Sequence, residues 1–324
     1  MQRDLKQLDE QILELMKERV AKTNSEHVSE IEQLTKQLDL IASTVSYKTT
    51  FTPSPLVGYQ GVSGAFSEQA CQNFFSKDVK TIGYPEFEDV YIALKNGDID
   101  YGVLPIENSS TGAINDNYDL IRKYGFYIVG ETAVNVDQCL IGIKGTKLED
   151  IKEVYSHPQG LAQSSDFFFA HRYMNPMPYK DTAMAAQYVS EAKDPTKAAI
   201  ASRLACELYG LEMLQEAIQN DKTNKTRFMV VSREFISPVD SDKVSVIFTL
   251  PHVVGSLSTM LEITTLYGVN LEKIESRPIK EENWQYYFYI DFLGNMRDGS
   301  VSKAIEEMKA KASTFRLLGN YKKA

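Results

Sequence analysis

The chain has 324 residues, 43% of them hydrophobic and 24% charged, which is the composition of a globular protein with room for two or three domains. A formal net charge of −9, without a stripe of Lys and Arg, argues against a nucleic-acid interface but allows a local site for an anion. No apolar run reaches the roughly 18 residues that a transmembrane helix needs, and no signal peptide follows Met1. We therefore expect a cytoplasmic protein that does not bind membranes.

The cysteines and histidines are scattered along the chain. Cys71, Cys139 and Cys206 are odd in number and lie in apolar surroundings, which indicates free thiols. The four histidines show no spacing typical of a metal site. We expect neither a disulfide nor a bound metal.

Two runs of apolar residues at steps of three and four predict a helical hairpin over residues 1–45. The first run is Leu5, Leu8, Ile12 and Leu15, and the second is Val28, Ile31, Leu34, Leu38 and Ile41. Residues 46–55 have no such period and contain Pro53 and Pro55, which indicates a linker.

Between residues 56 and 235 short apolar runs alternate with helical runs, which predicts an α/β domain with largely parallel strands. Five polar loops each follow an apolar run and precede a helical run; they begin at Gln60, Pro105, Ser156, Asp181 and Ser202. Ligands of open α/β sheets bind beyond the carboxyl ends of the strands, where helix N-termini attract anions. We therefore expect a site for an acid at these loops, between two lobes of the domain.

Residues 243–322 have another order of elements, which predicts a βαββαβ module of the ferredoxin-like type. The expected strands are 244–250, 271–274, 286–292 and 315–318, and the expected helices are 255–267 and 301–312.

Five sequence blocks occur in an order and spacing that closely resemble prephenate dehydratase followed by an ACT regulatory domain. The blocks are GVSGAFSEQA at 61–70, PIENSSTGAINDNYDL at 105–120, YSHPQ at 155–159, NKTRF at 224–228 and ESRP at 275–278. The resemblance implies a two-lobed catalytic domain like that of periplasmic binding proteins, with a C-terminal ACT domain that senses phenylalanine.

The same resemblance implies that Thr226 is the residue most involved in the chemistry, with Glu107, Asn108 and Gln159 as further catalytic residues. The residues implied to bind the substrate are Ser109, Ser156, His157, Thr182, Arg227 and Phe228. From its local sequence alone, Thr226 has a second interpretation as an ordinary β-branched residue at the start of a strand.

Prephenate, the implied substrate, loses its ring hydroxyl and its ring carboxylate and becomes aromatic, so no cofactor is expected. An unactivated threonine is a poor acid, so Thr226 is expected to donate a hydrogen bond to the departing hydroxyl, with Glu107 or His157 as the proton source. An ionised Glu107 would repel a dianion, so that role requires a raised pKa. The alternatives are that Glu107 only orients Asn108 or a loop amide, and that His157 only forms the turn before Pro158.

The ESRP block resembles the ACT segment that contacts an amino-acid effector, although a charged bulge ending a strand at Pro278 is an alternative interpretation. A second effector segment in the family usually reads Gly-Ala-Leu-Val, whereas residues 255–258 here read Gly-Ser-Leu-Ser. The effector-binding residues implied by the resemblance are Gly255, Ser256, Leu257, Glu275, Ser276, Arg277 and Pro278. Phenylalanine is the expected effector, with an affinity altered by the two serines.

Residues 1–45 resemble the first part of a chorismate mutase domain, with Arg19 at a substrate-binding position. Mutase chemistry needs several cations around two carboxylates, so mutase activity is not expected. Arogenate dehydratase and a non-catalytic sensor of organic acids and phenylalanine are the alternatives to prephenate dehydratase. The family implies a homodimer or homotetramer.

Overall fold

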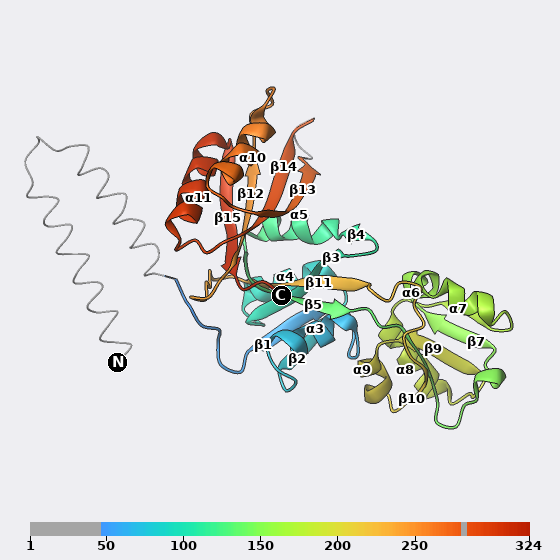
Figure 1. The fold of residues 1–324 in the computed structure, drawn as a ribbon. Coiled ribbons are helices and arrows are strands. Elements are labelled where there is room, and N and C mark those ends of the chain that lie inside the picture. Colours follow the sequence, from blue (N-terminus) through green and yellow to red (C-terminus); the bar gives the residue numbers. More distant parts are fainter. Residues whose placement is uncertain (1–46, 280–283) are drawn as a thin grey trace, which may run out of the picture.

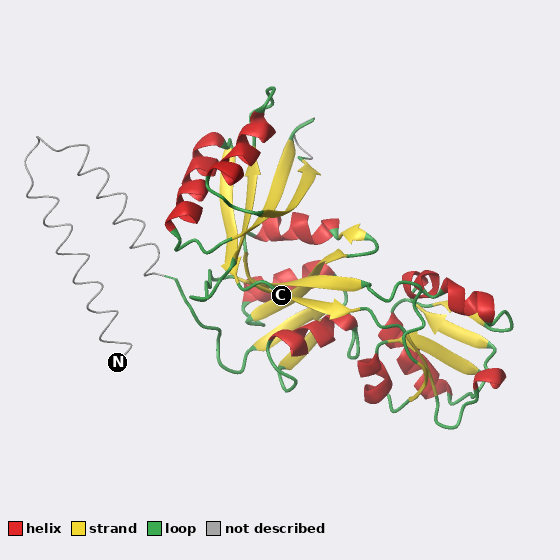
Figure 2. Cartoon of the chain, in the orientation of Figure 1, coloured by secondary structure: helices red, strands yellow, loops and turns green. Residues whose placement is uncertain are grey.

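The computed structural model describes residues 47–279 and 284–324, which form three β-sheets with helices around them (Figures 1 and 2). The helical hairpin expected over residues 1–45 lies outside these ranges. No helix within the described ranges is long and apolar enough to cross a membrane.

The first sheet has the strand order β2-β1-β3-β11-β5, with the short β4 beside β3. Its strands are β1 (Leu56–Gln60), β2 (Lys80–Tyr84), β3 (Tyr101–Asn108), β4 (Gly112–Ala113), β5 (Tyr127–Asn135) and β11 (Lys225–Ser232). Three helices pack on it, namely α3 (Phe66–Phe74), α4 (Phe87–Asn96) and α5 (Asn115–Tyr124). Neighbouring residues of a strand point to opposite faces, so Val103 packs in the cluster that contains α3 while Leu104 packs in the cluster that contains α4 and α5.

The second sheet has the order β10-β6-β9-β7-β8. Its strands are β6 (Cys139–Gly142), β7 (Glu153–Ser156), β8 (Asn175–Pro178), β9 (Lys197–Ala201) and β10 (Glu212–Gln215). Its helices are α6 (Pro158–Gln163), α7 (Ser165–Ala170), α8 (Thr182–Ala192) and α9 (Arg203–Leu208), with a 3-10 turn at Leu148–Asp150. Ala183, Ala185 and Ala186 of α8 are fully buried, because small side chains let this helix lie close to the sheet.

The prediction of largely parallel strands was wrong, because both sheets are mixed. The pairs β1–β2, β1–β3, β7–β8 and β7–β9 are parallel, whereas β3–β11, β5–β11, β6–β9 and β6–β10 are antiparallel. The cause is the path of the chain: β5 leads from the first sheet to the second, and β11 returns between β3 and β5 in the opposite direction. The polar loops mark where strands end, but they do not specify which strands become neighbours.

The third sheet is antiparallel and has the order β13-β14-β12-β15. Its strands are β12 (Lys243–Thr249), β13 (Leu271–Pro278), β14 (Tyr286–Leu293) and β15 (Thr314–Tyr321), and its helices are α10 (Ser256–Leu266) and α11 (Gly299–Lys311). The described elements follow the expected βαββαβ order. We call residues 243–321 the C-terminal module.

One face of the C-terminal module packs on its own helices α10 and α11, and the other packs on the first sheet (Figure 1). Ile247, Tyr289 and Leu318 of the module share a cluster with α4 and α5. A Cβ on Gly319 would lie 2.0 Å from the carbonyl oxygen of Ile128, so β15 and β5 are in backbone contact that only glycine allows. The module is therefore joined directly to the strands that end at the candidate site.

Candidate functional site

Thr226 and Asn108 form the centre of the candidate site. Asn108 is the last residue of β3 and Thr226 the second of β11, and the two are register partners. The side-chain amide of Asn108 donates to Thr226 Oγ1 across 2.9 Å and to Asn224 Oδ1 across 2.8 Å. Two blocks more than a hundred residues apart in the sequence thus meet where β3 ends and β11 begins.

The orientation of the Asn108 amide follows from its other contacts. Its Oδ1 accepts hydrogen bonds from the backbone N–H of Ser110 at 3.0 Å and from the N–H of Thr111 at 3.1 Å. Because a backbone N–H can only donate, the atom facing these groups must be the amide oxygen, and the NH2 group must face Thr226. Thr226 Oγ1 accepts this bond, so the hydroxyl proton of Thr226 remains available for another acceptor. Among the described residues, the Thr226 hydroxyl donates no hydrogen bond.

Ser109 connects the ends of β3 and β11. Its backbone N–H donates to the carbonyl of Lys225 across 2.9 Å, and its Oγ accepts from the N–H of Lys225 across 2.9 Å. This pair of bonds fixes the spacing of the strand ends beside Thr226. Both the backbone N–H and the Oγ of Ser109 are used in these bonds, so Ser109 holds the end of β3 against the start of β11.

The residues expected from the second sheet gather at the end of β7. The His157 side chain caps helix α6, with Nδ1 accepting from the backbone N–H of Gln159 at 3.2 Å. A neutral ring therefore carries its proton on Nε2. The side chains of His157 and Gln159 are exposed, and no hydrogen bond within the described ranges joins them to Thr226 or Asn108.

Ser156 does not fit the expected role in substrate binding. Its side chain is fully buried and its hydroxyl donates to the carbonyl of Ile200 across 2.7 Å, which ties β7 to β9. A Cβ on Gly160 would lie 2.8 Å from Ser156 Oγ and 3.6 Å from the methyl group of Thr182. Gly160 therefore lets the first turns of α6 and α8 approach each other. Thr182 is the first residue of α8, after the capping Asp181.

The first and second sheets with their helices form the two lobes of the domain, and the lobes also contact each other at the loop after β1. The hydroxyl of Ser202 donates to the carbonyl of Gly64 across 2.6 Å, and the hydroxyl of Tyr209 donates to the carbonyl of Ser63 across 2.8 Å. Gly64 has a φ of +92°, and a Cβ there would lie 3.0 Å from the backbone of Ala205. This contact between the two lobes is specific to glycine.

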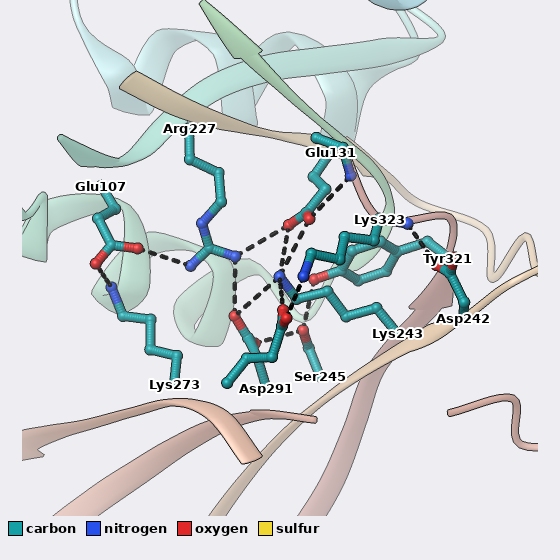
Figure 3. A network of polar contacts seen from close by, with 12 residues as sticks. Glu107, Glu131, Arg227, Asp242, Lys243, Ser245, Lys273, Asp291, Tyr321 and Lys323 are labelled. Carbon is teal, nitrogen blue, oxygen red and sulfur yellow. Dashed lines mark hydrogen bonds and ion pairs between the residues drawn. The ribbon is translucent and has the colours of Figure 1, made fainter. Parts of the chain in front are cut away.

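Glu107 and Arg227 point away from Thr226, contrary to expectation. Each is the neighbour of a site residue on its strand and therefore projects from the opposite face. Arg227 Nη2 lies 3.1 Å from Glu107 Oε2, and Lys273 Nζ of the C-terminal module lies 2.9 Å from Glu107 Oε1 (Figure 3). Both residues therefore belong to the junction with the C-terminal module and not to the face that carries Thr226.

The charge state of Glu107 also corrects the expectation of a protonated acid. Burial raises its pKa, but the hydrogen bond and charge of Lys273 and the charge of Arg227 outweigh burial, so the pKa lies below its ordinary value. A carboxylate that remains ionised near neutral pH does not serve as the proton source.

Phe228 is likewise not exposed to a ligand. Its side chain is 2% exposed and packs in the core cluster that contains α3. It shares the face of Thr226 but lies deeper in the sheet, so its place in the NKTRF block reflects packing.

Sequence reasoning missed the continuation of the charge network around Arg227. Arg227 Nη1 lies 2.9 Å from Asp291 and 3.0 Å from Glu131, and Lys243 Nζ lies 3.0 Å from Glu131 (Figure 3). Burial opposes the charge of Arg227, but the carboxylates of Asp291 and Glu131 outweigh it and raise the pKa of the guanidinium. A cavity of about 20 Å³ beside these residues has room for about one water molecule. Charged residues inside apolar strands, such as Lys243 before Val244, were the only signal in the sequence.

Comparison with known proteins decides the family. The sequence matches the prephenate dehydratase family over residues 57–235. The chain belongs to the prephenate dehydratase family.

Relatives of this dehydratase chain include proteins with more than one described activity. "Arogenate dehydratase/prephenate dehydratase 1, chloroplastic" from Arabidopsis thaliana is 38% identical over 281 residues, covering 82% of this chain and 71% of the relative. A prephenate dehydratase from Arthrobacter aurescens, solved in complex with L-Phe, is 30% identical with a TM-score of 0.76, covering 83% of this chain and 90% of that one. A protein described as a novel type of quorum quenching acylase is 29% identical with a TM-score of 0.76, covering 83% and 98%.

In this member of the prephenate dehydratase family the expected effector residues do not all face one way. Along β13 Glu275 and Arg277 face the first sheet, where Arg277 Nη2 lies 3.0 Å from Asp119 of α5. Ser276 and Pro278 lie on the exposed opposite face. Hydrogen-bonded pairing of residues 271–278 with β14 runs through Pro278, so the strand does not end in a bulge there.

The other expected effector segment begins helix α10. Gly255 has a φ of +86° and precedes the helix, and the hydroxyl of Ser256 donates to the carbonyl of Pro251 across 2.7 Å. Leu257 is half-buried. No hydrogen bond joins this segment to residues 275–278 within the described part of the dehydratase chain.

A metal site was not expected. Among the described residues no group of three or more His, Cys, Asp and Glu side chains could hold a metal ion.

Proposed function

We propose that this chain converts prephenate to phenylpyruvate, with loss of water and CO2. The observation that carries the proposal is the Asn108–Thr226 hydrogen bond, which presents the hydroxyl proton of Thr226 in a buried position at the ends of two strands. A donor held in place before the reaction stabilises the charge that develops on the departing hydroxyl without reorganisation. Membership of the prephenate dehydratase family supports the assignment.

The proton must come from another group, because a threonine hydroxyl is too weak an acid to protonate a leaving group alone. Glu107 is paired with Lys273 and Arg227 on the other face of the strands, which removes it from this role. His157 is the remaining candidate of the two, and its imidazolium form would be the acid. Because that form carries a proton on both ring nitrogens, it would have to give up the hydrogen bond that Nδ1 accepts from the N–H of Gln159. Substrate carboxylates are proposed to bind near Thr182 and Gln159, at the starts of α8 and α6.

Arogenate is a second candidate substrate, because a relative at 38% identity carries both dehydratase names. It differs from prephenate only in the side chain, and the chemistry at the ring is the same. The two substrates share the proposed role of Thr226.

An acylase activity, named for one structural neighbour, receives less support from the site. A threonine nucleophile needs a base to take its proton. The described contact of Thr226 Oγ1 is with the NH2 group of Asn108, which is a donor and not a base. The geometry therefore favours Thr226 as a hydrogen-bond donor.

We also propose that the C-terminal module is an ACT domain through which phenylalanine inhibits the enzyme, and that the protein is a homodimer or homotetramer. The order of its elements and the complex of a relative with L-Phe support this regulation. Ser256 and Ser258 stand in the effector segment, so the inhibition constant is expected to differ from that of relatives with apolar residues there.

The deciding experiment incubates the purified protein separately with prephenate and with arogenate and follows phenylpyruvate and phenylalanine. We expect product from prephenate well above the acid-catalysed background. Product from arogenate alone would move the assignment to arogenate dehydratase. No product from either substrate would leave the sensor interpretation, which binding of both acids without turnover would support.

A further inference from the structure

The ends of β3 and β11 carry two functional faces. Asn108 and Thr226 are register partners on one face, and Glu107 and Arg227 are register partners on the other. The pairing then shifts, since Phe228 faces Pro105 and leaves Ile106 as an extra residue. This bulge interrupts the β3–β11 ladder just before Glu107 and Asn108, while the start of β11 stays paired in register with β5. The end of β3 is therefore the less regular of the two.

Residues of the C-terminal module contact the face that carries Glu107 and Arg227. Lys273 Nζ lies 2.9 Å from Glu107, and Asp291 lies 2.9 Å from Arg227 (Figure 3). Lys273 and Asp291 are themselves register partners on β13 and β14. The pair Lys273 and Asp291 of the third sheet thus contacts the pair on the first sheet. The side chain of Lys273 is only 13% exposed.

We infer that Lys273 is a positioning residue for the reaction, acting through Glu107 to hold Asn108 and Thr226 in place. The inference rests on the proposed function of Thr226. Glu107 is bonded by backbone to Asn108, so a displacement of its carboxylate is transmitted to the residue that orients the Thr226 hydroxyl. A misplacement of about 1 Å in a catalytic group can slow an enzyme on the order of 100-fold.

Lys273 lies on β13, the strand that also carries the ESRP block. Arg277 lies on the same face of β13 and pairs with Asp119, so this strand makes ion pairs with the catalytic domain both at α5 and next to the site. A ligand that moves β13 would therefore move Lys273. A purely structural role is the competing explanation, in which Lys273 only joins two domains and affects stability without affecting Thr226.

Kinetics of three variants distinguish the two explanations. Lys273→Met keeps an unbranched apolar stem and removes the charged ammonium group. Lys273→Arg restores the charge. Lys309→Met changes an exposed lysine of α11 and is the matched control. We expect Lys273→Met to lower kcat on the order of tenfold with little change in KM, because the misplaced donor matters mainly in the transition state. Lys273→Arg should recover most of the loss, and Lys309→Met should behave as the unaltered protein.

A double variant tests whether the effect passes through Thr226. If it does, adding Lys273→Met to Thr226→Ala should lower kcat by less than about twofold, since interacting residues are not additive. A full tenfold further loss, or an unchanged kcat in Lys273→Met alone, would overturn the inference.

A measurement independent of turnover separates this inference from the proposed function. Hydrogen–deuterium exchange reports the backbone N–H groups of Ser109 and Lys225, which join the strand ends. In Lys273→Met their exchange should be faster on the order of tenfold, whereas exchange in the second sheet and in Lys309→Met stays unchanged. Absence of turnover in the unaltered protein would refute the proposed function alone; unchanged exchange at these two amides would refute the role of Lys273.

Discussion

The side-chain amide of Asn108 donates to the hydroxyl oxygen of Thr226 across 2.9 Å, and the direction of this bond is set by the backbone. Because Asn108 Oδ1 accepts from the N–H groups of Ser110 and Thr111, its NH2 group faces Thr226. Thr226 accepts one hydrogen bond and keeps its proton, which is the state a donor to a leaving group requires.

The role of the Thr226 hydroxyl is tested by three substitutions. Thr226→Ala and the isosteric Thr226→Val should lower kcat on the order of 100-fold with a much smaller change in KM, because the lost hydrogen bond acts mainly in the transition state. Thr226→Ser keeps the hydroxyl and should retain most of the turnover. Steady-state kinetics with prephenate gives both constants, and a Thr226→Val protein with unaltered kcat would contradict the assignment.

Asn108→Asp tests the direction of the hydrogen bond. The second carboxylate oxygen would replace the NH2 group, so Thr226 would donate its proton to that oxygen and lose it for the substrate. We expect kcat to fall about as far as in Thr226→Ala, with no further loss when both changes are combined.

The same Asn108→Asp variant should also lose stability, because the new anion faces the carbonyl oxygens of Asn224 and Lys225. Urea unfolding measures this loss. Ser110→Ala serves as the control, since the contact that Ser110 makes with Asn108 is through its backbone N–H. Turnover of Asn108→Asp equal to that of the unaltered protein would show that the bond direction is unimportant.

The lowered pKa of Glu107 predicts a pH dependence of stability. Because this pKa lies below the ordinary value of 4.5 in the folded protein, the folded state holds fewer protons than the unfolded state in that range. The stabilisation is therefore present above pH 4.5 and is lost as the pH falls through the folded-state pKa. The side chain is 37% exposed, so solvent screening keeps the effect small.

Urea unfolding at several pH values below neutrality measures this contribution. The free energy of unfolding should fall less steeply with acidification in Glu107→Gln than in the unaltered protein. Glu306→Gln, which changes an exposed residue of α11, is the control and should leave the slope unchanged. Identical slopes for Glu107→Gln and the unaltered protein would mean that Lys273 and Arg227 do not stabilise the charged carboxylate.

Gly64→Ala tests the contact between the two lobes. Its φ of +92° and the approach to Ala205 both oppose a side chain, so we expect a loss of about 1–3 kcal/mol in stability and a higher KM. Gly145→Ala is a matched control, because Gly145 has a φ of +84° but a Cβ added there would have no atom within 4 Å. The difference between the two variants isolates the contact, and equal effects on KM would show that it does not influence substrate binding.

The contact between Arg277 and Asp119 predicts how an effector signal reaches the catalytic domain. If that contact transmits the signal, Arg277→Ala and Asp119→Asn should each weaken phenylalanine inhibition severalfold and the double variant should add little. Inhibition curves for the three proteins supply the test. Full inhibition of Asp119→Asn would place the signal on another path.

The element pattern was largely predictable, because helices and strands are encoded in local periodicity. The polar segments precede helices in the structure, although residues 105–108 of the second one extend β3, and the βαββαβ order of the C-terminal module agrees with expectation. The direction of strand pairing was not predictable, since β11 lies between β3 and β5 only because the chain returns from the second sheet.

For the site, the sequence by itself identified the segments around Asn108 and Thr226, but it placed Glu107 and Arg227 in the same site because residues from Pro105 onward were expected to form a loop. In the structure β3 continues to Asn108, and alternation along β3 and β11 turns Glu107 and Arg227 to the other face. Only the tertiary structure decided what that other face meets. Lys273 and Asp291 lie far along the chain, and their pairing with Glu107 and Arg227 depends on how the C-terminal module packs on the first sheet. Local sequence identifies the strand segments. Long-range pairing, including the bulge at Ile106, and the packing of the C-terminal module determine which side a residue occupies, its charged partners and therefore its pKa and its role.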